Sequence, residues 1–367
     1  MFHDDGLTTA ARVARSLRSS AMQTQRMGAM PQKTLAIQFK YLGDAVFITP
    51  ALRALKQNQP EGNLHVLVAA EVAPLLEHLP WITKVWSLPR TRGRARIGDS
   101  WPIIRALRRE RFDRSVDFGG NDRGAILSKL SGARQRLASV DRASLLFKIC
   151  YSRQIMTATL PLGWVQRHLQ LLSAWQIPPP QSTRLEIAVD PTLAEAAAQL
   201  LPAGMIVCHL GTSQPRKEWP LDRWREFYRL ARAAGFALAF SSGTSERERT
   251  LLVDLEKMEP DIFSLPPVPS LKLFLAVLRR ARAVVAGDTG PLHFAAGLGV
   301  PVVGLFGAED SLLRAAPIYS ESQLVKNEEP VANGAVSGTV IDINQSCLER
   351  VSPVRVLAAL AKAVTGR

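Results

Sequence analysis

The sequence predicts an α/β protein built from two open, mostly parallel sheets with a cleft between them. Short apolar runs alternate with segments of 3.6-residue apolar periodicity, and this alternation is typical of βαβ units. A proline-rich break at Ile177–Pro180 separates two such series of about equal length. The 367 residues also fit two domains at roughly 100–200 residues each. Ligands of such sheets bind at the carboxyl ends of the strands.

The first series begins at Lys33, after a polar segment rich in Met, Ser and Ala that we expect to be a disordered tail over residues 1–32. Leu7, Ala10, Ala11, Ala14 and Leu17 form only a weak amphipathic stripe there. Apolar runs and helical spacing then predict strands at 34–39, 65–69, 84–88 and 114–118, and helices at 44–58, 72–78, 102–109 and 165–175.

The second series repeats the pattern after the break. The expected strands are 205–209, 236–241, 283–286 and 302–306, and the expected helices are 222–233, 246–257, 271–282 and 291–298. Ser352 as an N-cap and Pro353 at the first helical position predict a last helix through about Val364. We expect residues 351–367 to form this helix, with packing back on the first domain as one option.

Composition excludes several classes of protein. Hydrophobic residues make up 47% and charged residues 21%, so the chain can bury a core. No window approaches the ~18 uninterrupted apolar residues of a membrane span, and we do not expect a membrane-spanning enzyme. The three cysteines are far apart without a CxxC pair, which predicts buried free thiols. The N-terminus lacks the apolar core of a signal peptide, so a cytoplasmic protein is expected.

The net charge of +14 is concentrated in one stretch. Between Arg90 and Arg153 there are 16 Lys/Arg and six Asp/Glu. Such a surplus attracts nucleic acid, an anionic bilayer surface or a phosphorylated substrate, although it can also be an ordinary solvated surface. The stretch has no recognition motif and no interleaved aromatic residues, so we expect no nucleic-acid partner.

Asp44 is the first candidate for chemistry. It follows the first strand in the loop Lys40-Tyr41-Leu42-Gly43-Asp44, at the carboxyl edge of the sheet. Aspartate is a favoured N-cap, and capping alone would explain the residue. The functional alternative is a carboxylate that faces the cleft as a general base.

Two loops of the second series suit a diphosphate. The loop 287–293 (Gly-Asp-Thr-Gly-Pro-Leu-His) begins a helix with two glycines and a threonine, where backbone N–H groups and the helix dipole favour phosphate. The loop 209–220 carries Thr212, Ser213 and Lys217 after a strand. These hydroxyls and this cation could neutralise a diphosphate leaving group without a metal.

Other well-known motifs are absent from the sequence. No GxGxxG opens a helix after a strand, and there is no GxxxxGK[ST], GxSxG or HExxH. A dinucleotide-binding fold, a P-loop ATPase, an α/β-hydrolase and a zinc protease are therefore disfavoured.

Four motifs along the chain resemble, in order and separation, those of glycosyltransferase family 9, the ADP-heptose-dependent heptosyltransferases of lipopolysaccharide core assembly. The resemblance extends from about Lys33 to Val364, and its pieces are Gly43-Asp44 with Thr49-Pro50-Ala51-Leu52, then Lys217-Glu218-Trp219-Pro220, Gly243-Thr244-Ser245-Glu246 and Asp288-Thr289-Gly290-Pro291-Leu292-His293. It implies the GT-B fold, with residues 33–180 binding the acceptor and residues 181–350 binding the ADP-sugar donor, each as a Rossmann-like domain.

The resemblance also implies roles for single residues. Asp44 would be the general base, and the donor would be bound by Thr212, Ser213, Lys217, Glu246, Leu271, Asp288, Thr289, Gly290 and His293. The acceptor would be met by Lys40, Tyr41, Arg92, Arg94 and Arg123, although Tyr41-Leu42 stand where many relatives carry small hydroxyl residues. No metal and no cofactor are implied.

The expected reaction is an inverting, metal-independent transfer of heptose or a related sugar to an anionic glycolipid. The expected location is the inner face of the inner membrane of a Gram-negative-type bacterium, as a peripheral protein. A nucleotide-sugar epimerase shares the two-domain plan and stays open as an alternative, as does, more remotely, a basic nucleic-acid-binding protein.

Overall fold

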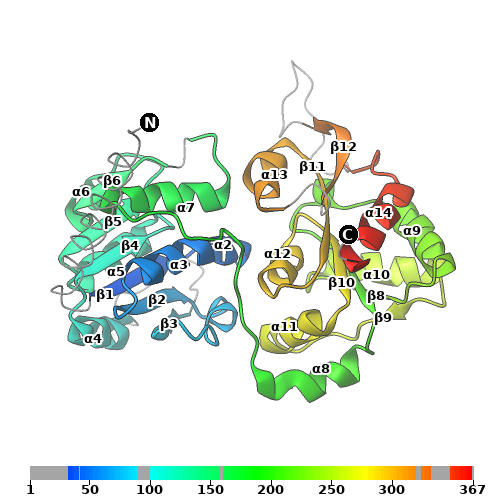
Figure 1. Cartoon of the computed structure of the whole chain (residues 1–367), viewed down its shortest axis with the longest axis horizontal. Coiled ribbons are helices and arrows are strands. Elements are labelled where there is room, and N and C mark those ends of the chain that lie inside the picture. The colour runs from blue at the N-terminus through cyan, green and yellow to red at the C-terminus, as the bar shows by residue number, and fades with distance from the viewer. Residues whose placement is uncertain are drawn as a thin grey trace, which may run out of the picture.

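Two parallel sheets form the framework of the molecule (Figure 1). The computed structural model describes residues 32–40, 42–89, 100–157, 160–319, 324–331 and 348–365. The first six-stranded sheet contains β1 (Lys33–Gln38), β2 (Asn63–Ala69), β3 (Lys84–Leu88), β4 (Arg114–Asp117), β5 (Gln135–Ser139) and β6 (Arg153–Ile155). The second contains β7 (Ile206–His209), β8 (Leu238–Ser241), β9 (Phe263–Ser264), β10 (Ala283–Gly287), β11 (Val302–Ala308) and β12 (Leu324–Val331).

Helices cover both sheets. Those of the first domain are α2 (Leu42–Phe47), α3 (Thr49–Asn58), α4 (Trp101–Glu110), α5 (Asp122–Leu130), α6 (Leu145–Cys150) and α7 (Trp164–Leu172). Those of the second are α8 (Ala194–Leu200), α9 (Leu221–Ala233), α10 (Glu246–Met258), α11 (Leu271–Arg280), α12 (Gly290–Gly297), α13 (Glu309–Arg314) and α14 (Pro353–Thr365). Within the described ranges, no helix is long and apolar enough to cross a bilayer.

Both sheets have the same strand order. It is β3-β2-β1-β4-β5-β6 in the first and β9-β8-β7-β10-β11-β12 in the second, with all pairs parallel. This is the order of a Rossmann-like domain, in which the connections change direction between the first and fourth strands and ligands bind at that point. The two binding points are therefore the loops after β1 and β4, and those after β7 and β10. The predicted α/β class with two Rossmann-like domains is confirmed.

The two domains share one continuous hydrophobic core cluster, which is joined where α2 contacts α12. Helix α12 lies at the side of the second domain that faces α2 (Figure 1). A Cβ on Gly297 would lie 3.2 Å from Ile187 and 3.4 Å from Val46, tighter than ordinary side-chain packing. The absence of a side chain at this position allows α12 to approach the first domain closely.

The expected single helix 44–58 is instead two helices, α2 and α3, with a joint at Ile48. Pro50 causes the break, because proline cannot donate to the carbonyl four residues earlier and its ring clashes with it. That carbonyl, of Val46, accepts a hydrogen bond from Thr49 Oγ1 at 2.7 Å. The break sets the direction of the short helix that carries Asp44.

The segment that links the domains is held from both sides. The backbone N–H of Glu186 donates to Thr49 Oγ1 (3.0 Å), and Arg53 Nε donates to the Glu186 carboxylate (2.9 Å). The next residue, Ile187, donates its N–H to the carbonyl of Gly297 (3.0 Å). These contacts fix the linker between α3 and α12.

Several local expectations differ from the structure. The expected helix 72–78 is only a 3₁₀ turn at Ala73–Leu75, because Pro74 lies within so short an apolar segment. The expected tail, 1–32, lies outside the described residues apart from residue 32. Short or edge elements were not expected, namely α5, α6, α8, α13, β5, β6, β9 and β12.

Helix α14 packs on the second domain, which corrects the option that it returns to the first. It contacts α9, β10, β11 and β12, and Val356 and Leu360 are fully buried in the second cluster of that domain. The reason is that Trp219 Nε1 donates to the carbonyl of Val351 at 3.1 Å, which directs the helix across α9.

Truncating the buried side chain of Leu360 tests the placement of α14. Leu360→Ala should cost about 2–5 kcal/mol of unfolding free energy, as a buried leucine does. Val354→Ala on the same helix is the matched control, because Val354 is 59% exposed, and should change stability by no more than about 0.5 kcal/mol. Hydrogen exchange in Leu360→Ala should rise in β10 and β11. A rise in β1 and β2 instead would contradict the placement.

Candidate functional site

One cavity of about 1140 Å³ lies between the domains and fits a ligand larger than a single sugar. Its walls come mainly from the loops after β7, β8, β9 and β10. From the first domain it is lined by Leu42, Gly43, Asp44, Phe47 and Trp164. Of the predicted site residues, the structure brings to this cavity Asp44, Ser213, Lys217, Leu271, Asp288, Thr289, Gly290 and His293.

A cluster of three charged or titratable groups stands at one end of the cavity. Lys217 Nζ lies 2.6 Å from Asp288 Oδ2, and His293 Nε2 lies 3.2 Å from Asp288 Oδ1. The Lys217 and Asp288 side chains are 14% and 12% exposed. Burial alone would raise the pKa of Asp288, but the hydrogen bonds from His293 and Lys217 and the charge of the Lys217 ammonium bring that pKa below its usual range. Asp288 is therefore a carboxylate.

The first turn of α12 adds positive potential beside this cluster. Thr289 is the N-cap residue and makes no side-chain cap hydrogen bond, and both Thr289 and Gly290 line the cavity. The N-terminal end of a helix carries a partial positive charge and N–H groups without helical partners. An anionic group at this end of the cavity would meet Lys217 from one side and α12 from the other.

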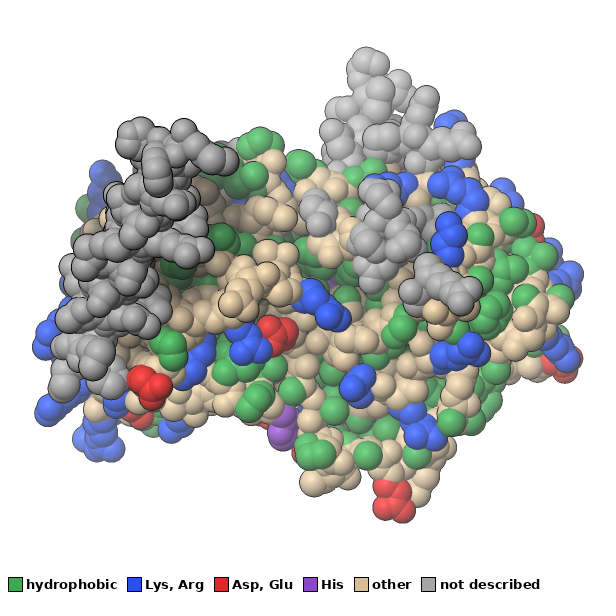
Figure 2. Space-filling model, viewed as in Figure 1, with side chains coloured by type: hydrophobic (Ala, Val, Ile, Leu, Met, Phe, Trp, Pro, Cys, Tyr) green, Lys and Arg blue, Asp and Glu red, His purple; other side chains and the backbone are tan. Residues whose placement is uncertain are grey.

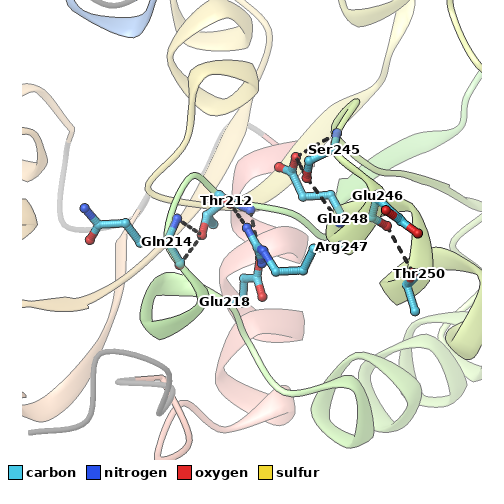
Figure 3. A network of polar contacts seen from close by, with 8 residues as sticks. All are labelled: Thr212, Gln214, Glu218, Ser245, Glu246, Arg247, Glu248 and Thr250. Atoms are coloured by element: carbon cyan, nitrogen blue, oxygen red, sulfur yellow. Dashed lines mark hydrogen bonds and ion pairs between the residues drawn. The ribbon is translucent and has the colours of Figure 1, made fainter.

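The loop after β7 is shaped by α10, as Figure 3 shows. Arg247 forms an ion pair with Glu218, and its Nη2 donates to the carbonyl of Thr212 at 2.6 Å. The Thr212 hydroxyl donates to the carbonyl of Gln214 at 2.6 Å, and the side chain is 1% exposed. Thr212 therefore organises the loop and does not line the cavity, contrary to the expectation, whereas Ser213 does.

Glu248, and not Glu246, faces the cavity from the first turn of α10. Ser245 caps this helix through a reciprocal pair of contacts with Glu248, and a Cβ on Gly243 would overlap the Glu248 carboxylate. In Figure 3 the Glu246 side chain points away from the loop after β7. The expectation that Glu246 lines the site is thus corrected, since the helix turns that position outward.

One stretch of the cavity wall is apolar. It is formed by Leu252, Val253, Leu265, Pro266, Pro267, Val268, Leu271 and Phe274, which follow β8 and β9. At its inner edge, burial lowers the pKa of His209 to about 4, so the imidazole is neutral and shares a 2.9 Å hydrogen bond with Ser241 Oγ. Because β8 and β9 lie on one side of β7 and β10 on the other, the apolar wall and the charged cluster are at opposite ends.

Asp44 enters the cavity from the first domain. It is the third residue of α2, which begins at Leu42, so it does not stand at the N-cap position expected from the sequence. Phe47, one turn later, packs against His293 with ring centroids 4.7 Å apart. The carboxylate of Asp44 and the Lys217–Asp288–His293 cluster therefore line the same cavity from opposite domains.

The predicted acceptor residues are placed only in part. Lys40 lies with its Nζ 6.0 Å from the Trp164 ring centroid, and Trp164 lines the cavity. Arg123 instead donates to the carbonyl of Pro89 (3.0 Å) and stacks on Phe39, away from the cavity lining. Tyr41, Arg92 and Arg94 lie outside the described residues.

Sequence reasoning did not identify several residues of this site. Glu248 was recognisable as the last residue of a Ser-x-x-Glu capping box. Trp164, Arg314 and the apolar wall had no local signal, because they reach the cavity only through the tertiary fold. Among the described residues, no group of three or more His, Cys, Asp or Glu side chains is arranged to hold a metal ion.

Comparison with known proteins agrees with this geometry. The family model of glycosyltransferase family 9 (heptosyltransferase) matches residues 100–337. The chain is 27% identical over 310 residues to lipopolysaccharide heptosyltransferase 1 of Pseudomonas aeruginosa, covering 80% of this chain and 82% of the relative.

Two solved structures share the fold. A family 9 glycosyltransferase from Veillonella parvula aligns with a TM-score of 0.76 at 16% identity, covering 92% of this chain and 99% of that one. An Escherichia coli heptosyltransferase with ADP-2-deoxy-2-fluoro heptose aligns with a TM-score of 0.65 at 20% identity, covering 90% and 99%. The GT-B fold is thereby confirmed. The family match covers more than half of the chain, and the protein belongs to glycosyltransferase family 9, the heptosyltransferase family, and is a glycosyltransferase.

Proposed function

We propose that this enzyme transfers a heptose from ADP-heptose to an anionic glycolipid acceptor of the lipopolysaccharide core, with inversion and without a metal. The observation that carries the proposal is that one cavity presents Asp44 from the first domain and the Lys217–Asp288–His293 cluster from the second. Relatives named as lipopolysaccharide heptosyltransferases supply the sugar and the acceptor class.

The two ends of the cavity match the parts of an ADP-sugar. The apolar wall after β8 and β9 suits an adenine ring, and the Glu248 carboxylate beside it suits ribose hydroxyls, which donate to it. The diphosphate would lie between Lys217 and the N-terminal end of α12. Ser213 also lines the cavity and could donate a hydrogen bond to it. The E. coli neighbour with ADP-2-deoxy-2-fluoro heptose supports an adenosine diphosphate donor.

In the proposed reaction the Asp44 carboxylate accepts the proton of an acceptor hydroxyl. The oxygen then forms a bond to the anomeric carbon while the bond from that carbon to the diphosphate oxygen breaks. The bonding pair leaves on the diphosphate, where Lys217 and α12 stabilise the added negative charge. Asp288 is held by Lys217 and His293, so it can accept hydrogen bonds from sugar hydroxyls without itself facing the phosphates.

Asp44→Asn tests the general base. The amide cannot accept the proton, so turnover should fall by a factor on the order of 10²–10⁴, while ADP affinity stays within about twofold because the donor residues lie on the other domain. Single-turnover transfer and calorimetric titration with ADP measure the two quantities. Turnover within threefold of wild type would remove Asp44 from this role. Release of free or epimerised sugar without acceptor would instead support an epimerase.

Glu248→Gln and Glu246→Gln form a matched pair for the ribose contact. Glutamine preserves the capping box but removes the charge that strengthens the hydrogen bonds, so Glu248→Gln should weaken ADP binding by roughly tenfold. Glu246→Gln, one half-turn away, should leave it unchanged. Calorimetric dissociation constants decide the matter, and equal effects from the two variants would contradict the assignment.

The membrane placement has support on the outer edge of the first domain. In α6, Leu145 is 75% exposed and Ile149 is 58% exposed, one helical turn apart on one face. Arg142 and Lys148 are exposed beside them, and Figure 2 shows Lys and Arg side chains along this outer edge of the first domain. An exposed apolar pair beside two cations, one of them paired with Asp122, favours the surface of an anionic bilayer.

Vesicle binding tests this placement. The protein should sediment with vesicles that contain anionic lipid and be released as salt rises, because screening reduces surface attraction. Arg142→Glu with Lys148→Glu should reduce binding several-fold. The control is Lys257→Glu with Arg355→Glu, an equal charge change on α10 and α14 of the second domain. Equal losses in both double variants, or salt-independent binding, would contradict a bilayer-facing α6.

A further inference from the structure

A buried tyrosine, Tyr319, contacts His293 of the Lys217–Asp288–His293 cluster. Tyr319 follows the 3₁₀ turn Ala316–Ile318 and is 8% exposed. Its hydroxyl lies 2.6 Å from His293 Nδ1, and the two rings stack with centroids 6.0 Å apart. Phe306 also packs against the tyrosine ring, with centroids 5.8 Å apart. Nothing in the sequence motifs pointed to this residue.

The donors and acceptors of the hydrogen bonds from Tyr319 through His293 to Asp288 can be assigned from chemistry. Burial raises the pKa of Tyr319 well above its usual value, and the Asp288 charge raises it further, so the phenol keeps its proton. Asp288 is a carboxylate and can only accept, so His293 Nε2 must carry a hydrogen to make the 3.2 Å contact. With a neutral imidazole, Nδ1 is then an acceptor, and it can receive the Tyr319 hydroxyl hydrogen.

We propose that Tyr319 is a positioning residue of the donor site, which holds His293 in the Nε2–H tautomer and thereby aims Asp288 and Lys217. In this arrangement the Tyr319 hydroxyl donates to His293 Nδ1, and His293 Nε2–H donates to Asp288 Oδ1. Lys217 Nζ donates to Asp288 Oδ2. The tautomer follows from this geometry for a neutral imidazole, whereas its consequence for sugar transfer rests on the proposed function.

Protonation of His293 would disturb this arrangement. An imidazolium donates from both nitrogens, so the Tyr319 hydroxyl would have to turn and accept, and its own hydrogen would lose the imidazole as partner. Asp288 opposes this by favouring the charged ring, with Lys217 on its far oxygen. On the remaining side His293 meets Phe47, which has no charge, while Asp44 lines the same cavity from α2. The hydrogen bond from the Tyr319 hydroxyl to Nδ1 therefore exists only while the ring is neutral.

Tyr319→Phe removes the hydroxyl and keeps the ring. Histidine-selective ¹⁵N NMR of the full chain should show wild-type His293 as the neutral Nε2–H tautomer. In Tyr319→Phe the Nε2–H tautomer should lose population, because the hydrogen bond that Nδ1 accepts is lost. His293→Asn identifies the resonance among the six histidines. The matched control is Tyr228→Phe, whose buried hydroxyl donates to the carbonyl of Asp261 away from the cavity.

The kinetic part uses the same variants. Tyr319→Phe should raise the donor KM on the order of tenfold, about the effect of one buried hydrogen bond, and leave the acceptor KM unchanged. In a His293→Asn background the substitution should have no further effect, because Tyr319 acts through that ring. Tyr228→Phe should change neither constant, and thermal unfolding of each variant separates a folding defect from a local one.

Three outcomes are decisive. An Nδ1–H tautomer in the wild-type protein would overturn the proposal, as would an unchanged tautomer population of His293 in Tyr319→Phe, whatever the enzyme transfers. Additive effects of Tyr319→Phe and His293→Asn on donor KM would also overturn it. The expected tautomer in the wild-type protein, with its loss in Tyr319→Phe, in a protein that transfers no heptose would leave Tyr319 as the positioning residue and reject only the proposed function.

Discussion

The ion pair between Lys217 and Asp288 is the interaction on which the rest of the site depends. It joins the loop after β7 to the turn after β10, the two strands at which the connections of the second sheet change direction. A pair this far from solvent stays favourable only when its remaining oxygen is also hydrogen-bonded. His293 supplies that bond, so one carboxylate fixes a cation, an imidazole and the start of α12.

The same cluster extends the constraint across the domain boundary. His293 packs on Phe47 of α2, and Gly297 at the far end of α12 lets Val46 and Ile187 approach. The linker is held by Thr49 and Arg53 on one side and by Gly297 on the other. Helix α12 thus positions both the Lys217–Asp288–His293 cluster and α2. Asp44 lies in the cavity wall because α2 is short and packs against α12.

Much of the fold could be predicted because both sheets are parallel and covered on both faces. Their central strands are continuous apolar runs, and the long helices show clear periodicity. Edge and short elements such as β6, β9 and α6 have too few residues for either signal. The break at Ile48 follows from Pro50, yet a proline in the first turn of a new helix and one that ends a helix look alike in sequence.

Residues that line the cavity were predicted where a motif places them at a strand end, as for Asp44, Lys217 and Asp288, and their roles stay predictions. The prediction failed where helix phase decides the lining, since Glu248 lines the cavity and Glu246 does not. It was also wrong for Thr212, whose hydroxyl is used within its own loop. Tyr319 and Trp164 could not be predicted from the sequence, because the contact of Tyr319 with His293 and the position of Trp164 in the cavity wall depend on the tertiary fold.

The central claim is that the protein's own charges at Lys217 and the start of α12 hold the diphosphate. Calorimetric titration of ADP in excess EDTA tests it most directly, with wild-type protein, Lys217→Ala and the surface control Lys257→Ala. The account predicts that ADP binds without divalent metal, that Lys217→Ala weakens binding by at least roughly tenfold, and that Lys257→Ala does not. Binding that appears only when Mg²⁺ is restored, or that is unchanged in Lys217→Ala, would contradict it.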